Sequence, residues 1–270
     1  MKSNGSNGIE SIINTERYPI FDPDSPALRE VIEWARNQIA RQSLCELTDF
    51  VRPSALPTIK KGVKSLRPKA HRTVGEETAY DPLPDPSFPE DHPRRICMPY
   101  SLEVVAYDQF PDSSPLRRIY ELNAFMQFVR RILRLGTIYP YADKLGALNA
   151  VFMAKGDVLQ WHFDEHDFAI SLAIEKAGRG GDFELSPRIR SANQECYSEV
   201  RKVLQGDFSK VRRIAMRPGT LVLFEGRYSL HRVSPIESGQ PRVIALFCYD
   251  TKPDTMGKES QRLTRYGRNN

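Results

Sequence analysis

The spacing of hydrophobic positions along the chain changes near its middle. Up to about residue 135, apolar residues recur every three or four positions in three stretches, which is typical of amphipathic helices. The first stretch follows Ser25 and Pro26, a capping residue and a first-turn proline. The last one ends before Gly136, a common helix stop. We therefore expect helices from Pro26 onward and over residues 54–66 and 114–135.

From about residue 145 the apolar positions form short runs, separated by turns rich in glycine and proline. Such runs are typical of an all-β sandwich or barrel. A helical pattern at residues 191–204 interrupts them. We therefore expect a mainly β fold, with N-terminal and inserted α-helices around a β core. The predicted strands span residues 148–154, 158–163, 168–174, 183–186, 213–216, 220–224, 230–235 and 242–249.

These patterns divide the chain into three zones. Residues 1–25 are rich in Ser, Asn and Gly and are expected to be a flexible lead-in. Residues 26–253 form one domain, with helical support over 26–135 and the β core over 145–253. Residues 254–270 are expected to be a C-terminal tail. Prolines recur between residues 68 and 99, which predicts a long irregular segment and makes it a candidate lid.

Composition narrows the class of protein. Hydrophobic residues make up 40% of the chain, enough for a sizeable core, and no run approaches the ~20 apolar residues of a membrane span. The N-terminus is polar, so we expect a soluble cytoplasmic protein. Four separated cysteines predict neither a disulfide framework nor a zinc ribbon. The net charge of +5 is dispersed in short basic runs, which disfavours a nucleic-acid partner.

Two polar side chains end one of the predicted strands, in the motif Trp161-His162-Phe163-Asp164. Residues two apart on a strand point the same way, so His162 and Asp164 can both face the barrel interior. A second imidazole, with open coordination positions, would complete the facial triad of non-haem Fe(II) oxygenases. Among the five histidines of the chain, His231 is the other one in a strand context in the β half.

Arg242 begins the last predicted strand, eleven residues after His231. A buried guanidinium needs an anionic partner, and a dicarboxylate co-substrate held by a bidentate fork supplies one. Each of these four residues has an ordinary alternative, as a strand end, a core histidine or a structural ion pair. An HxD motif alone also occurs by chance in many proteins. Their order and their shared strand context together favour the oxygenase reading.

The C-terminal half resembles the 2-oxoglutarate/Fe(II) oxygenase superfamily, whose fold is the double-stranded β-helix, or jelly roll. More closely, it is similar to a group of microbial enzymes that includes radical halogenases and hydroxylases of free amino acids and is associated with natural-product biosynthesis. The resemblance covers roughly residues 45–253. Its main motifs are Ala147-Leu148-Asn149, Gly156-Asp157, Trp161-His162-Phe163-Asp164, Gly180-Gly181-Asp182, Gly219-Thr220-Leu221, Leu230-His231-Arg232-Val233 and Pro241-Arg242.

The resemblance implies that His162, Asp164 and His231 bind Fe(II) and that Arg242 binds the C5 carboxylate of 2-oxoglutarate. O2 is the implied oxidant, and ascorbate is an expected stimulant. Halogenating members replace the carboxylate ligand by a small residue, which opens a position for halide. Asp164 occupies that position here, which favours hydroxylation. The expected substrate is a small amino-acid-like metabolite, and the expected state is a monomer or homodimer.

Contacts to the substrate are predicted at Glu165, His166, Asp167 and Tyr228, which lie close to the iron ligands in sequence. Asn149 is expected on a strand beside the HxD strand, in contact with co-substrate or substrate. Two alternatives remain open at this point. One is a nucleic-acid or protein demethylase or hydroxylase of the same fold, although Cys248 stands where nucleic-acid demethylases carry a second arginine. The other is a non-catalytic jelly-roll protein that binds a metal or small molecule.

Overall fold

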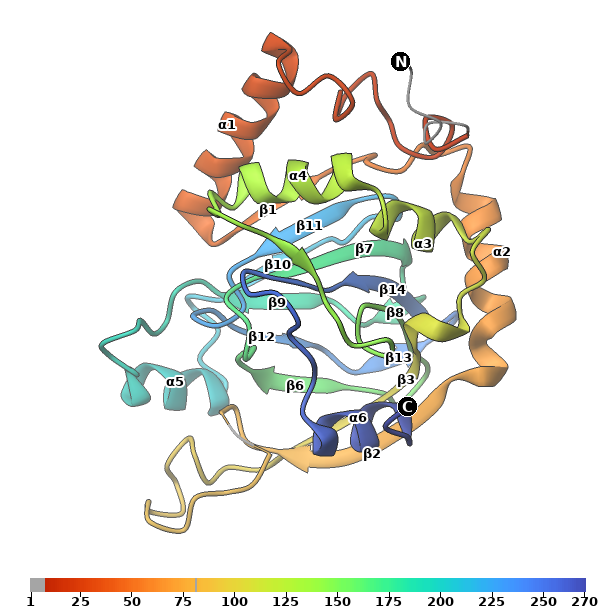
Figure 1. Cartoon of the computed structure of the whole chain (residues 1–270). Helices are drawn as coiled ribbons and strands as arrows, with labels where there is room; N and C mark the ends of the chain where they lie inside the picture. Colours follow the sequence, from red (N-terminus) through yellow and green to blue (C-terminus); the bar gives the residue numbers. More distant parts are fainter. Residues whose placement is uncertain (1–7, 81) are drawn as a thin grey trace.

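The computed structural model describes residues 8–80 and 82–270 as a curled antiparallel sheet with helices packed on its outer side (Figure 1). The described residues form six α-helices, and none of these is long and apolar enough to cross a membrane. The helices are α1 (Pro26–Gln42), α2 (Leu56–Leu66), α3 (Pro115–Tyr120), α4 (Asn123–Ile132), α5 (Tyr197–Leu204) and α6 (Glu259–Tyr266).

The main sheet follows the order β1-β11-β7-β14-β5-β3-β6-β12-β9-β10, and β2 adds to β3. All of its neighbouring strands run antiparallel, as in the predicted jelly roll. Two small two-stranded sheets pair β8 with β13 and β4 with β15. The strands are β1 (Leu44–Leu47), β2 (His71–Glu77), β3 (Met98–Val105), β4 (Tyr139–Pro140), β5 (Leu148–Met153), β6 (Leu159–His162), β7 (Ala169–Glu175), β8 (Arg179–Gly180), β9 (Phe183–Ser186), β10 (Arg212–Ile214), β11 (Leu221–Phe224), β12 (Leu230–Val233), β13 (Ile236–Ser238), β14 (Arg242–Phe247) and β15 (Tyr249–Asp250).

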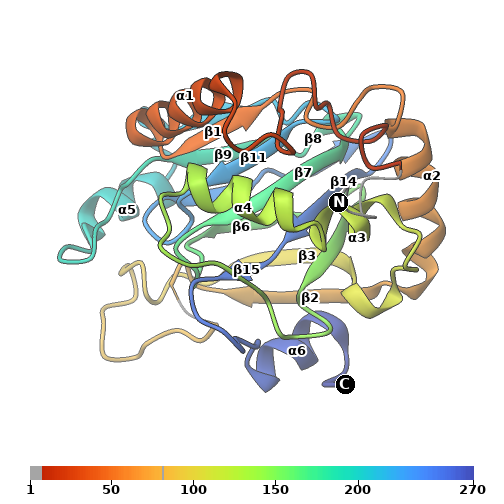
Figure 2. The ribbon, with the colours of Figure 1, turned by 45° about the horizontal axis from the view of Figure 1, so that its top comes forward.

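Alternation along the strands divides the core into an outer and an inner cluster. On β5, Ala150 and Phe152 pack outward in one cluster with the helices, whereas Val151 and Met153 belong to a second cluster inside the curl. Both faces are therefore buried. Figures 1 and 2 both show α1 and α4 on one side of the sheet, with β2 and α6 on the opposite side of the molecule.

The first helix begins where the sequence predicts, because the Ser25 hydroxyl accepts a hydrogen bond from the Leu28 amide at 3.2 Å. The predicted helix over 114–135 is wrong as one unit and divides into α3 and α4. Leu122 has an extended backbone between them. The break leaves the carbonyl of Tyr120 free to accept a hydrogen bond from the Tyr249 hydroxyl at 2.6 Å. A tertiary contact thus outweighs the continuous helical pattern.

Three segments differ from the sequence expectations. The segment over 68–99 is not irregular throughout, because β2 pairs with β3 along its whole length. Part of the expected lead-in is packed, with Ile9 and Ile13 in the core, while residues 1–7 lie outside the described residues. The expected tail contains α6, which ends at Gly267 in the left-handed conformation. The ordered structure of each of these three segments depends on contacts with residues that are distant in the sequence.

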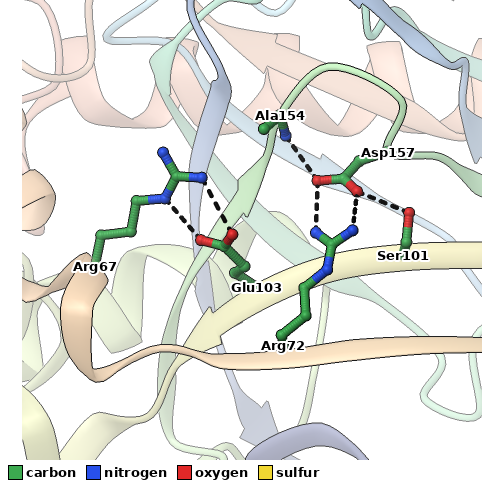
Figure 3. A network of polar contacts seen from close by, with 6 residues as sticks. All are labelled: Arg67, Arg72, Ser101, Glu103, Ala154 and Asp157. Atoms are coloured by element: carbon green, nitrogen blue, oxygen red, sulfur yellow. Dashed lines mark hydrogen bonds and ion pairs between the residues drawn. The ribbon is translucent and has the colours of Figure 1, made fainter.

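A buried carboxylate secures the start of the HxD strand (Figure 3). Asp157 lies in the turn between β5 and β6, and its side chain is 3% exposed. It accepts hydrogen bonds from Arg72 on β2, from the Ser101 hydroxyl at 2.8 Å and from the Ala154 amide at 2.7 Å. Arg67 and Glu103 form a second bidentate pair nearby. These contacts hold the turn that leads into β6, which begins three residues before His162.

Candidate metal centre

Three potential metal ligands converge where β6 ends beside β12. His162 and His231 stand directly opposite each other on these antiparallel strands, with ring centroids 4.2 Å apart. The Asp164 carboxylate lies 3.5 Å from Nε2 of His231 and 3.9 Å from Nε2 of His162. One ligand atom from each residue lies within 4.8 Å of the others. The three residues predicted from the sequence are therefore brought together at one point.

Backbone carbonyls orient both imidazoles. Nδ1 of His162 lies 2.8 Å from the carbonyl of Gln160, and Nδ1 of His231 lies 2.9 Å from the carbonyl of Ser229. A hydrogen bond from Nδ1–H leaves Nε2 as the lone-pair nitrogen, and such contacts commonly fix metal-binding histidines. Both Nε2 atoms face the Asp164 carboxylate, so the donors already point at a common centre.

The position of the Asp164 carboxylate depends on Gly226, which has no side chain to fill the same space. The Asp164 amide donates to the Gly226 carbonyl at 3.2 Å, and a Cβ built on Gly226 would lie 1.8 Å from Oδ2. Oδ2 itself is buried and accepts no hydrogen bond from the described residues. A buried carboxylate oxygen without a partner is costly, whereas a bound cation would satisfy it. Two imidazoles and one carboxylate are also the donor set of mononuclear non-haem iron sites. The residues therefore fit such an ion.

Electrostatics keep two of the three groups ready to bind a cation. Burial alone would raise the pKa of Asp164, but the charge and hydrogen bond of His231, together with His162, lower it to about 2. Burial and the nearby His231 lower the pKa of His162 to about 4. Burial opposes protonation of His231, yet Asp164 outweighs it and raises the pKa of that imidazole. Metal binding at this site thus competes with a proton held between Asp164 and His231.

Arg242 lies on the inner face of β14, together with Ile244 of the inner cluster. Its side chain is buried, and burial lowers its pKa to about 10, while the charge of Asp182 opposes that effect. Across residues 8–80 and 82–270, no hydrogen bond or ion pair to its guanidinium is formed. A buried guanidinium in this condition is expected to receive an anionic ligand. The buried, unpaired guanidinium of Arg242 is therefore consistent with its predicted role of binding a carboxylate of 2-oxoglutarate.

Ser171 is a polar residue of this interior that the sequence analysis missed. Its Oγ is buried and has no hydrogen-bond partner among the described residues. On β7 it lies between Ala169, paired with Phe224 beside His231, and Glu175, paired with Val243 beside Arg242. Ser171 is thus placed between the triad and the arginine. Its sequence signal was a single serine in the otherwise apolar strand Ala-Ile-Ser-Leu-Ala-Ile.

The predicted substrate contacts mostly have protein partners. Glu165 pairs with Lys258 at 2.9 Å, His166 lies 3.4 Å from Asp250, and Asp167 pairs with Arg227. Tyr228 is half-buried on the β11–β12 connection. Contact of these four residues with a substrate stays a prediction.

Asn149 is occupied by other parts of the chain. Its amide nitrogen donates to the carbonyls of Leu145 and Leu148, both at 2.9 Å. Its Oδ1 accepts from the Tyr266 hydroxyl at 2.9 Å and from Nε of Arg265 at 3.3 Å. Direct contact of Asn149 with co-substrate stays a prediction, since residues of α6 already donate hydrogen bonds to its buried Oδ1.

Comparison with known proteins gives one family and many structural relatives. The model of the family described as Halogenase D matches residues 92–265. No curated protein matches. Three similar solved structures are a 2OG-Fe(II) oxygenase family oxidoreductase from Burkholderia pseudomallei (12% identity, 82% of this chain and 91% of that one, TM-score 0.52), AviO1 from Streptomyces viridochromogenes Tue57 (14%, 83% and 96%, 0.54) and HygX from Streptomyces hygroscopicus (10%, 80% and 86%, 0.53). At these identities the structures support a shared fold.

Proposed function

The chain belongs to the halogenase D family and is an enzyme of the Fe(II)/2-oxoglutarate oxygenase superfamily, and we propose that it hydroxylates a C–H bond of a small amino-acid-like molecule. The metal ligands in this proposal are His162, Asp164 and His231. Arg242 binds the distal carboxylate of 2-oxoglutarate. The HygX structure carries nickel, 2-oxoglutarate and hygromycin B, and its shared fold supports this choice of metal site and co-substrate.

The observation that carries the proposal is the Asp164 carboxylate beside two imidazoles. In the halogenating relatives that the sequence resembles, a small residue replaces this ligand and leaves a position for halide. Here the backbone of Gly226 leaves room for the carboxylate, and the carboxylate fills that room. Hydroxylation is therefore the reaction that the ligand set supports best within this family.

When bound, Fe(II) and 2-oxoglutarate supply the oxidising chemistry, in which O2 is consumed, succinate and CO2 are released and one oxygen atom enters the substrate. The chain's own residues hold and shield the reacting centre. Nε2 of each histidine presents a lone pair, and Asp164 supplies one negative charge. Arg242 and Ser171 offer donors along the interior to a dicarboxylate. Phe224 and Phe183, with ring centroids 5.0 and 5.8 Å from His231, exclude water beside that ligand.

A turnover assay tests the proposal. Purified protein is supplied with Fe(II), ascorbate and 2-oxoglutarate, and succinate is measured over a panel of free amino acids and their derivatives. The proposal predicts that some panel members accelerate succinate release. The same compounds should gain roughly 16 Da, the mass of the one oxygen atom that hydroxylation adds. His162→Ala should abolish both. A wild-type protein that neither binds 2-oxoglutarate nor releases succinate would contradict it.

A further inference from the structure

The carboxylate of Asp164 belongs to a residue that lies just beyond its strand. β6 ends at His162, so the next two residues extend past the strand. Each of them is held through its backbone amide. The amide of Phe163 donates to the carbonyl of Ala79 at 3.0 Å, and that of Asp164 donates to the carbonyl of Gly226 at 3.2 Å. The direction of the Asp164 side chain therefore depends on how these two residues are held.

Phe163 points away from the metal centre. It is buried in a small cluster with Trp161, outside the inner cluster of the barrel, and its ring centroid lies 5.1 Å from that of Tyr80. Successive residues of an extended chain point to opposite faces, so the face taken by Phe163 determines the face taken by His162 and Asp164. A contact that fixes the Phe163 ring therefore helps to aim the neighbouring carboxylate.

Arg190 makes such a contact from the connection between β9 and α5. Its guanidinium carbon lies 3.9 Å from the centroid of the Phe163 ring, and its side chain is 14% exposed. A guanidinium is attracted to the face of an aromatic ring, most strongly where water is excluded. An Nη atom of Arg190 also pairs with Glu195 at 3.0 Å. The stacked position of the guanidinium over Phe163 is thus supported by an ion pair.

The same residue is tied to the turn between β11 and β12, which faces Asp164. Nε of Arg190 donates to the carbonyl of Arg227 at 2.7 Å, and the Arg190 amide donates to the carbonyl of Tyr228 at 3.3 Å. Arg227 directly follows Gly226, whose carbonyl binds the Asp164 amide. Arg190 therefore bridges the two segments that meet at the Asp164 carboxylate.

We propose that Arg190 is a positioning residue of the metal centre, which holds Phe163 against this turn and thereby aims the Asp164 carboxylate at the two imidazoles. The inference rests on the proposed oxygenase function and adds to it a residue outside the barrel interior. A cation near a metal site repels the bound metal ion, so the charge of Arg190 alone would weaken Fe(II) binding. Removing Arg190 should then strengthen binding if only its charge matters, and weaken binding if it positions the ligand.

The test compares wild type with Arg190→Met, Arg190→Lys and Arg94→Met. Methionine keeps an unbranched side chain beside Phe163 but has no guanidinium. Arg94→Met is the matched control, because Arg94 stacks over Tyr80 in the same cluster at 4.6 Å and donates to the Tyr197 hydroxyl at 2.9 Å. The readouts are the anaerobic dissociation constant for Fe(II), the visible charge-transfer absorption of the Fe(II)–2-oxoglutarate complex and the Tm.

We expect Arg190→Met to bind Fe(II) about 10- to 100-fold more weakly than wild type, the usual effect of losing a residue that orients a ligand. Its absorption band should shift, because the carboxylate is no longer held in the same direction. Arg190→Lys should lie between the two, since an ammonium group keeps the charge but lacks the planar fork. Arg94→Met should lower the Tm as Arg190→Met does, yet match wild type in Fe(II) affinity and absorption.

Three results would overturn the inference and leave the proposed function intact. One is an Arg190→Met protein that binds Fe(II) at least as tightly as wild type, or whose absorption band stays at the wild-type position. The second is an equal loss of Fe(II) affinity in Arg94→Met, which would show that loosening the aromatic cluster is enough. If Arg190→Met does not fold, Arg190→Lys decides, and wild-type Fe(II) affinity in that variant is the third. Failure of wild type to bind Fe(II) and 2-oxoglutarate would instead overturn the proposed function itself.

Discussion

Gly226 leaves the space that the Asp164 carboxylate occupies, since a Cβ at position 226 would lie 1.8 Å from Oδ2 and 2.6 Å from Cγ of Asp164. The two residues come from separate segments, joined by the hydrogen bond from the Asp164 amide to the Gly226 carbonyl. The carboxylate proposed as the third metal ligand is thus positioned by the absence of a side chain at Gly226.

Gly226→Ala should displace the Asp164 carboxylate and weaken Fe(II) binding by about 10- to 100-fold, the usual cost of disturbing a ligand's support. Anaerobic Fe(II) titration measures this. Gly136→Ala is the matched control, because a Cβ there meets nothing within 4 Å, and it should bind Fe(II) like wild type. Equal affinities in the two variants would show that the contact does not hold the ligand.

The Arg242→Met substitution should weaken 2-oxoglutarate binding without destabilising the ligand-free protein. Loss of the guanidinium should weaken 2-oxoglutarate binding by about 100-fold, since charged hydrogen bonds contribute roughly 1.5–3 kcal/mol each. The ligand-free protein should unfold at the same or a higher temperature, because a buried charge without a partner is replaced by an apolar side chain. Isothermal titration and thermal unfolding measure the two effects. A large drop in Tm would reveal a structural partner for Arg242 instead.

Ser171→Ala tests the donor that the sequence analysis missed. Its Oγ has no described partner, so removing it should leave ligand-free stability within about 0.5 kcal/mol of wild type. If the hydroxyl contacts the co-substrate, 2-oxoglutarate affinity should fall about tenfold, close to the value of one hydrogen bond. An unchanged affinity would remove Ser171 from the site.

Asp157 makes the free energy of unfolding depend on pH. Burial alone would raise its pKa, but Arg72, the Ala154 amide and Ser101 outweigh this and hold the pKa below the usual 3.8. Its contribution to stability is therefore fully present above the usual value and is lost as pH falls through the lowered value. Asp157→Asn should cost about 2 kcal/mol near neutral pH, and the deficit should shrink in acid. Denaturant unfolding at both pH values measures this.

The exposed Asp112, which pairs with Arg117, is the control for that comparison, because its side chain is 89% exposed. Asp112→Asn should change the free energy of unfolding by less than about 0.5 kcal/mol at either pH. A deficit for Asp157→Asn that persisted unchanged into acid would mean that packing, and not the charge, is lost.

The sequence was sufficient to predict that the C-terminal half is rich in strands. It was also sufficient to identify the residues now proposed as the iron ligands and the co-substrate arginine. His231 and Arg242 could be recognised because each is a polar residue in an apolar strand, and the alternation of a strand predicts which way it points. The contributions of Gly226 and Ser171 could not be recognised from the sequence. The role of Gly226 depends on how closely a distant segment approaches its backbone, and that of Ser171 depends on its hydroxyl lacking a partner in the folded chain. Likewise β2 and α6 gain their order from β3 and from Asn149.

The most direct measurement is an anaerobic titration of the protein with Fe(II) and then 2-oxoglutarate, followed by visible charge-transfer absorption, in wild type and Asp164→Ala. The account predicts one Fe(II) and one 2-oxoglutarate bound per wild-type chain. When O2 and a substrate are then admitted, wild type should hydroxylate the substrate and Asp164→Ala should not. Wild-type protein that forms no Fe(II)–2-oxoglutarate complex, or an Asp164→Ala variant that hydroxylates as well as wild type, would contradict the account.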